Sequence, residues 1–347
     1  MTAVNEGPPR PPKKTGRNRG PDKPDRIMRV LSGIQSSGKL HLGNYFSMMK
    51  RMIDYQEKAE LYCFIASYHA LTTVSDRQVM EGSILDAALD FLALGLDPER
   101  SVFWVQSDVP EVTELTWLLS TSITVSQLEL AHSYKDKTAQ GIVPSAGLMF
   151  YPVLMTADIL AFQANKVPVG KDQKQHLEMA RDIRERFNKT YGETFAEPEP
   201  DILGDVALVP GTDGRKMSKS YGNTINFFET EKKLRKQVMS IVTDSTPVEE
   251  PKEPAGALFD IYRLFLDEAG VKELEKRFRT PGEGYGHIKQ SLYEAILEHF
   301  GPAREKRADL AKRPDDVRDM LAMGAKKARA TARETLDRAR ENMGLVY

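Results

Sequence analysis

Cysteine, tryptophan and long apolar runs are scarce in this chain of 347 residues. The single cysteine, Cys63, excludes an intramolecular disulfide and any metal site built on several cysteines, and it suits a reducing compartment. No stretch approaches the roughly 18 consecutive apolar residues of a membrane span. The N-terminus also lacks the apolar segment of a secretory signal. We therefore expect a cytoplasmic protein with no membrane partner.

Net charge is also nearly absent, because 49 basic residues face 50 acidic ones and leave a formal charge of −1. Whole-chain charge thus gives no sign of a nucleic-acid partner, and any basic surface must be local. The hydrophobic share of 40% excludes a mostly disordered chain. At about 150 residues per domain, the length favours two domains.

The chain divides into four parts. Residues 1–26 are basic and rich in proline, which predicts a disordered extension. From 27 to 228, short apolar strands alternate with helical patterns. The expected strands are 27–31, 61–66, 102–105, 167–170 and 206–209, and the expected helices are 43–58, 77–95, 146–164 and 173–189, with shorter helices within 111–135. This alternation predicts an α/β fold with a Rossmann-like, doubly wound parallel sheet.

Strand signals disappear beyond residue 229. Charged amphipathic patterns predict helices at 229–243, 255–269, 271–277, 285–299 and 302–312. We therefore expect an all-helical domain over 229–313. A last helix, within 314–347, begins at Pro314 and stops at Gly344.

Two loops carry chemistry. Residues 33–39 satisfy the phosphate-binding pattern G-x-x-x-x-G-K, but Leu40 stands where a P-loop needs a hydroxyl for Mg²⁺, which disfavours a P-loop NTPase. His41-Leu42-Gly43-Asn44 follows at a loop-to-helix junction, where free N–H groups suit an anionic phosphate. His41 and Asn44 would share one helix face; the alternative is a helix cap with an ordinary surface histidine.

The second loop, 211–223, is polar and basic. Its Lys216 and Lys219, together with the hydroxyls of Ser218 and Ser220, suit a triphosphate whose charge shifts during a reaction. The alternative, a solvated hinge between domains, explains the Lys-Met-Ser-Lys-Ser run poorly.

Together the two motifs resemble the signatures of class I aminoacyl-tRNA synthetases. Segments 32–35, 43–45, 151–160 and 167–176 are similar to bacterial members of the tryptophanyl-tRNA synthetase family, and the resemblance covers 27–347. It implies a nucleotide-binding domain over 27–228 that carries both motifs and an anticodon-binding domain over 229–313. It also implies a C-terminal helix that packs back toward the catalytic domain, and a homodimer.

The resemblance further implies residue roles. His41, Asn44, Lys137, Lys216 and Lys219 would be catalytic, with both loop lysines following the leaving pyrophosphate. ATP would contact Gln35, Ser36, Ser37, Gly43, Asn44, Gly170, Lys171, Asp172, Ala207, Lys216, Met217, Ser218, Lys219 and Ser220. Mg²⁺ would arrive with ATP, and no protein metal site is expected.

For the amino acid, Asp158 in an apolar helix would accept the indole N–H of L-tryptophan, an indole being a donor only. Met155 would pack on the ring, Tyr151 and Gln173 would bind the amino and carboxylate groups, and His69 would lie beside them. The alternatives are a capped core aspartate for Asp158 and a core histidine for His69.

The implied chemistry forms tryptophanyl-adenylate and pyrophosphate, then transfers the tryptophanyl group to tRNA(Trp). The chain departs from many relatives at Ser36 and at Ser67-Tyr68, beside His69. Ser36 would loosen the ATP loop, whereas Ser67-Tyr68 suggests altered affinity or tolerance for ring-modified tryptophans, as in a specialised second copy. A paralogue with a binding or regulatory role is a second hypothesis.

Overall fold

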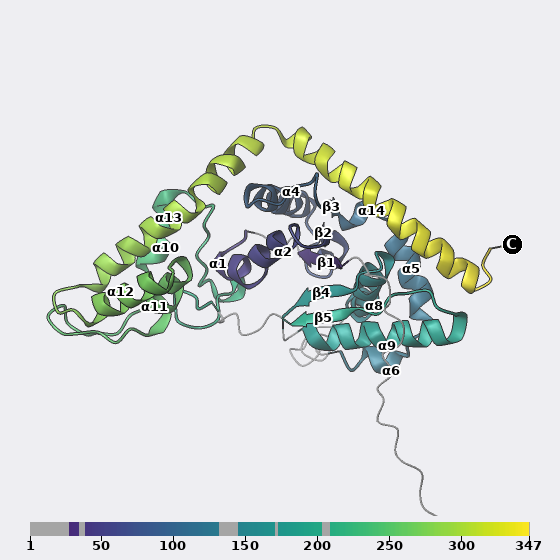
Figure 1. The fold of residues 1–347 in the computed structure, drawn as a ribbon, viewed down its shortest axis with the longest axis horizontal. Helices are drawn as coiled ribbons and strands as arrows, with labels where there is room; N and C mark the ends of the chain where they lie inside the picture. Colours follow the sequence, from purple (N-terminus) through teal and green to yellow (C-terminus); the bar gives the residue numbers. More distant parts are fainter. Residues whose placement is uncertain (1–27, 35–38, 132–144, 171–172, 203–208, 347) are drawn as a thin grey trace, which may run out of the picture.

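The computed structural model describes residues 28–34, 39–131, 145–170, 173–202 and 209–346. Its centre is a parallel sheet of five described strands in the order β3-β2-β1-β4-β5 (Figure 1). The strands are β1 (Arg29–Ile34), β2 (Glu60–Ile65), β3 (Val102–Val105), β4 (Lys166–Val169) and β5 (Glu199–Ile202). The predicted α/β fold with a parallel sheet is confirmed.

Two strands differ from the prediction. β1 continues through Ser32 to Ile34, predicted as loop, because these residues keep their register with Cys63 to Ile65 of β2. β5 was missed because Glu199-Pro200-Asp201 has no apolar pattern, and only pairing with β4 makes it a strand. The extension 1–26 lies outside the described residues, as does the predicted strand 206–209 except for Val209.

Helices connect successive strands along the chain and pack against the sheet. The first runs as α1 (Leu42–Asn44), a π-helical turn (Tyr45–Met49) and α2 (Lys50–Tyr55). The others are α3 (Ser67–Ala70), α4 (Arg77–Ala93), α5 (Glu111–Ser120), α6 (Val125–Leu128), α8 (Ala146–Ala161) and α9 (Lys174–Tyr191). Asp76 caps α4 as predicted, because its carboxylate accepts the Val79 N–H at 2.9 Å.

The rest of the described chain is helical: α10 (Glu231–Met239), α11 (Gly256–Tyr262), α12 (Glu268–Arg279), α13 (Tyr285–Leu310) and α14 (Pro314–Asn342). The predicted break between 299 and 302 was wrong, because Pro302 lies inside a continuous α13. Phe300 and Leu310 are buried on either side of Pro302, and Glu298, four residues before it, is exposed. Packing on both sides of the proline thus holds the helix together.

Helix α14 runs back along β3, an edge strand of the sheet (Figure 1). The approach requires glycine, since a Cβ on Gly324 would lie 1.7 Å from the Phe103 carbonyl oxygen. Arg329 adds an ion pair at 2.9 Å to Glu111, which is buried on α5. The terminal helix therefore covers a strand edge that would otherwise be free to pair.

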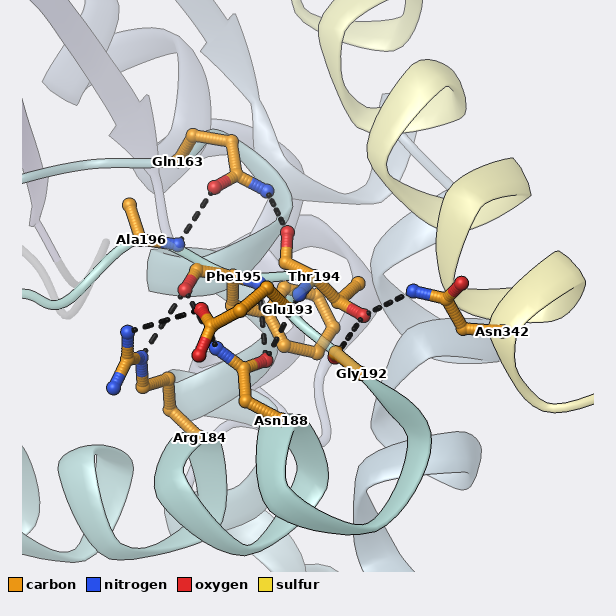
Figure 2. A network of polar contacts seen from close by, with 9 residues as sticks. All are labelled: Gln163, Arg184, Asn188, Gly192, Glu193, Thr194, Phe195, Ala196 and Asn342. Carbon is orange, nitrogen blue, oxygen red and sulfur yellow. Dashed lines mark hydrogen bonds and ion pairs between the residues drawn. The ribbon is translucent and has the colours of Figure 1, made fainter.

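The far end of α14 is held by a polar network (Figure 2). Asn342 donates to the Thr194 hydroxyl at 2.7 Å, and Gln163 binds the backbone of Thr194 and Ala196. The Asn188 side chain accepts the N–H groups of Thr194 and Phe195 at 3.1 Å. The turn after α9 is thereby fixed by side chains of α9, of α14 and of the turn after α8. No helix of the described ranges has the length and apolarity that a bilayer crossing requires.

Candidate active site

The His41-Leu42-Gly43-Asn44 segment forms the start of α1. His41 is the N-cap residue and is only 5% exposed, so the alternative of an ordinary surface histidine was wrong. Its backbone N–H donates to Asn44 Oδ1 at 3.1 Å, which ties the two motif residues to each other. A Cβ on Gly43 would lie 2.9 Å from His41 Nδ1. Glycine is therefore needed for the histidine ring to fold over the helix start.

The two signature segments meet at this point. The Gly43 N–H points at Met217 Sδ at 3.4 Å, and Met217 is buried. Burial, aided by the charge of Lys219, lowers the pKa of His41 to about 4. Partial desolvation likewise lowers the pKa of Lys219. His41 is therefore neutral near pH 7, and the exposed lysines of the second loop carry the positive charge near this junction.

Asn223 organises the second loop. Its side chain accepts the Ser218 N–H at 2.8 Å and donates to Asp213 Oδ1 at 2.7 Å and to the Lys216 carbonyl at 3.1 Å. Asn223 is buried, whereas Lys216, Lys219 and Ser220 are exposed. The buried Asn223 amide thus holds the second loop from inside, while the loop's two lysines are exposed to solvent. Sequence reasoning missed Asn223, because no spacing distinguishes a buried amide from a solvated one.

The Asp158 carboxylate is 2% exposed in α8 and has two side-chain partners. His69 Nε2 lies 2.9 Å from its Oδ2. Gln106 Nε2 lies 2.8 Å from both carboxylate oxygens. Gln106 was not predicted, although it directly follows β3 at the carboxyl edge of the sheet, where ligands of parallel sheets bind. His69 lies on the short helix α3.

The sequence departures lie beside this group. The backbone N–H of Tyr68 donates to Gln106 Oε1 at 3.0 Å, and Ser67 Oγ accepts the Ser107 N–H at 3.0 Å. The Gln106 amide is thus oriented with its NH₂ toward Asp158. Tyr68 therefore orients the side chain that holds Asp158, and Ser67 holds the residue next to it.

The other predicted tryptophan-site residues lie on neighbouring elements. The Tyr151 ring is 6.1 Å from the ring of His69, and its hydroxyl is hydrogen-bonded to Nε2 of the buried His176. Met155 is half-buried on α8, one turn before Asp158. The Gln173 N–H donates to the Gly170 carbonyl at 3.0 Å where α9 begins. The structure therefore brings Asp158, His69 and Tyr151 together.

Several predicted residues lie outside the described part of the chain, namely Gln35, Ser36, Ser37, Lys137, Lys171, Asp172 and Ala207. Gly33, the first glycine of the P-loop pattern, is part of strand β1. It packs against Phe64, since a Cβ there would lie 2.5 Å from Phe64 Cζ, and this packing accounts for the glycine without a P-loop. Among the described residues no cluster of three or more histidine, cysteine or acidic side chains could hold a metal ion.

A parallel sheet whose first helix starts at His41, with the Met217 loop packed on that start, defines a class I aminoacyl-tRNA synthetase. The family model for class I tRNA synthetases (W and Y) matches residues 23–301. The chain therefore belongs to this family, in its tryptophanyl branch.

Close relatives agree with this assignment. The tryptophan–tRNA ligase of Fusobacterium nucleatum is 56% identical over 92% of this chain and 99% of its own length. The crystal structure of tryptophanyl-tRNA synthetase from Campylobacter jejuni complexed with ADP and tryptophan has a TM-score of 0.87 and 52% identity, covering 91% of this chain and 100% of that one.

Proposed function

We propose that this chain is a tryptophan–tRNA ligase that couples L-tryptophan to tRNA(Trp) at the expense of ATP. The carboxylate of tryptophan attacks the α-phosphate of MgATP, which releases pyrophosphate and leaves tryptophanyl-adenylate. The tryptophanyl group then passes to the terminal ribose of the tRNA. No protein nucleophile is needed, so the chain acts by positioning the reactants and stabilising charge.

The buried Asp158 carboxylate determines which amino acid the site selects. An indole N–H is a donor without acceptor capacity, so it can satisfy one of the oxygens that Gln106 and His69 hold in place. A phenylalanine ring would leave that oxygen without its ligand. A mismatch of this kind costs a factor on the order of 10⁴–10⁵ in selectivity.

The phosphate end of the site is proposed at the junction of the two signature segments. His41 and Asn44 would face the triphosphate from α1, while Lys216, Lys219 and Lys137 would follow the pyrophosphate. The remaining ATP contacts are proposed at Gln35, Ser36, Ser37, Gly43, Gly170, Lys171, Asp172, Ala207, Met217, Ser218 and Ser220. Mg²⁺ would enter as part of MgATP and neutralise phosphate charge.

The domain roles follow from the family. Residues 229–313 would bind the anticodon, and charging of tRNA(Trp) with a substituted anticodon tests this role. The proposed tRNA substrate also favours a cytoplasmic location.

An apolar surface beside Tyr151 favours a homodimer. A cavity of about 330 Å³ opens there. Leu71 and Phe150 line the cavity and are exposed, and Trp117 is 70% exposed on the adjacent α5. Exposed apolar side chains of this size favour burial against a second copy. Sedimentation equilibrium of the chain and of Trp117→Lys tests this, and an unaltered monomer for both would contradict it.

The decisive experiment measures tryptophan-dependent exchange of pyrophosphate into ATP. An analogue with sulfur in place of the indole N–H should be used less well than tryptophan by a factor on the order of 10⁴, and Asp158→Ala should erase that preference. Amino-acid-independent ATP turnover would indicate an NTPase, and no exchange at all would favour a regulatory paralogue. Ring-substituted tryptophans in the same assay test the proposed tolerance at Ser67-Tyr68.

A further inference from the structure

The stretch of chain that follows the second loop runs beside the start of α1. The Ile225 carbonyl accepts the Leu42 N–H at 3.0 Å. The Asn226 side chain donates from Nδ2 to the Leu40 carbonyl at 3.1 Å. Asn226 is only 8% exposed, and the two leucines and the isoleucine are buried as well. Water therefore competes little for these bonds, which join two stretches that lie far apart in the sequence.

The Asn226 amide has a defined orientation. Its own backbone N–H donates to Gln237 Oε1 at 3.0 Å, and a backbone N–H can only donate. The Gln237 Nε2 group is thereby turned to Asn226 Oδ1, 3.1 Å away, and this oxygen also accepts the Thr224 hydroxyl at 3.0 Å. The donor end of Asn226 is left for the Leu40 carbonyl. Gln237, on α10, thus sets the direction of the bond to the start of α1.

The peptide unit between Leu40 and His41 is held at both of its polar groups. Asn226 binds its carbonyl, and Asn44 Oδ1 accepts its N–H, which belongs to His41, at 3.1 Å. A peptide unit is planar, so bonds to its two opposite groups fix its rotation. The His41 Cα lies in that plane, and the point from which its side chain projects is fixed as well. Neither signature segment contains Asn226 or Gln237.

The flanks of α10 contact both loops. Before the helix, Glu229 Oε1 lies 2.6 Å from Lys39 Nζ, but the lysine is 62% exposed, so this pair contributes little. After the helix, the Val242 N–H donates to the Thr212 carbonyl of the second loop at 2.7 Å. The buried amide pair is therefore the firmer link between α10 and the start of α1.

We propose that Asn226 and Gln237 are positioning residues for His41: Gln237 orients the Asn226 amide, which holds the peptide before His41 so that the start of α1 is set for a triphosphate. This inference rests on the proposed function. Without the Asn226 donor, the Leu40 carbonyl loses this bond and the peptide can turn. ATP then has to order the segment as it binds, which weakens ATP binding and slows the reaction.

The test compares Asn226→Ala with the parent in tryptophan-dependent pyrophosphate exchange. We expect kcat/KM for ATP to fall about tenfold, through a higher Michaelis constant for ATP and a lower kcat. The Michaelis constant for tryptophan should not change, because Gln106 and His69 hold Asp158. In a His41→Ala background, Asn226→Ala should have no further effect, since the group that it positions is gone.

Asn188→Ala is the matched control (Figure 2). Asn188 is likewise buried, and its Nδ2 donates to the Phe195 carbonyl at 3.0 Å. This variant should lower the unfolding free energy but leave the Michaelis constant for ATP at the parent value. A merely structural role for Asn226 would give the same pattern, namely fewer folded molecules with unaltered ATP binding.

Should Asn226→Ala fail to fold by circular dichroism, Gln237→Leu takes its place. Gln237 is only half-buried, and leucine keeps its approximate volume while removing both groups that orient Asn226. We expect the Michaelis constant for ATP to rise about threefold. An unchanged Michaelis constant for ATP in the folded variant, or losses that add to those of His41→Ala, would overturn the inference. A parent without exchange would instead overturn the proposed function.

Discussion

The Gln106 side-chain amide donates to both carboxylate oxygens of Asp158, at 2.8 Å each, from the turn that follows β3. The Tyr68 N–H fixes the other end of that amide. A carboxylate offers about four acceptor sites, so this contact and the one from His69 leave capacity for a further donor. The buried carboxylate is thus satisfied by two partners and retains room for the ligand N–H proposed for it.

Gln106→Leu should therefore damage recognition of tryptophan. It keeps the approximate volume but removes the donor, so Asp158 loses its orientation and part of its charge compensation. We expect kcat/KM for tryptophan in pyrophosphate exchange to fall about 10- to 100-fold, with the Michaelis constant for ATP nearly unchanged.

A matched control for that variant exists at Gln56. This side chain likewise uses both ends of its amide, but on two backbone groups, the Gly95 carbonyl at 3.0 Å and the Asp97 N–H at 2.9 Å. Gln56→Leu should lower the unfolding free energy without altering kcat/KM. Equal kinetic losses in both variants would reject the special role of Gln106.

The sequence predicted those elements whose signals are local. The apolar run of Val102–Val105 and the cap at Asp76 were read correctly because burial and capping act over a few residues. The two signature motifs were recognised from local residues alone, and the structure brings them together through Gly43 and Met217; the phosphate site expected there stays a prediction.

What was missed depends on contacts between distant residues. Gln106 and Asn223 are polar residues that become buried only when other elements close over them. The same holds for Pro302, whose helix is continued by packing of Phe300 and Leu310 on either side. Local spacing carries no information about such partners, so the internal supports of the site appear only in the folded chain.

His41 makes stability depend on pH in a defined direction. Its pKa is about 4 in the folded chain and 6.5 when unperturbed, so the unfolded state binds more protons between these values. The stabilisation from neutral His41 is complete above pH 6.5 and is lost as the pH falls toward 4. The unfolding free energies of the parent and of His41→Asn, measured in urea, should differ by an amount that depends on pH in this window. The slope of that difference against pH should correspond to the binding of up to one proton on unfolding. A difference independent of pH would contradict the buried, neutral histidine.

Gly324 sets how closely α14 can approach the sheet. A Cβ added there would meet the Phe103 carbonyl oxygen at 1.7 Å, and backbone atoms cannot rotate away. Gly324→Ala should therefore displace α14 and lower the unfolding free energy by about 3 kcal/mol in urea titration. Gly301→Ala is the control, because a Cβ at Gly301 in α13 meets no atom within 4 Å. That variant should instead gain about 0.5–1 kcal/mol from helix propensity. Since Gln106 directly follows β3, the folded fraction of Gly324→Ala should also activate tryptophan more slowly. If both alanine variants were equally stable, α14 would not rest on β3 through this glycine.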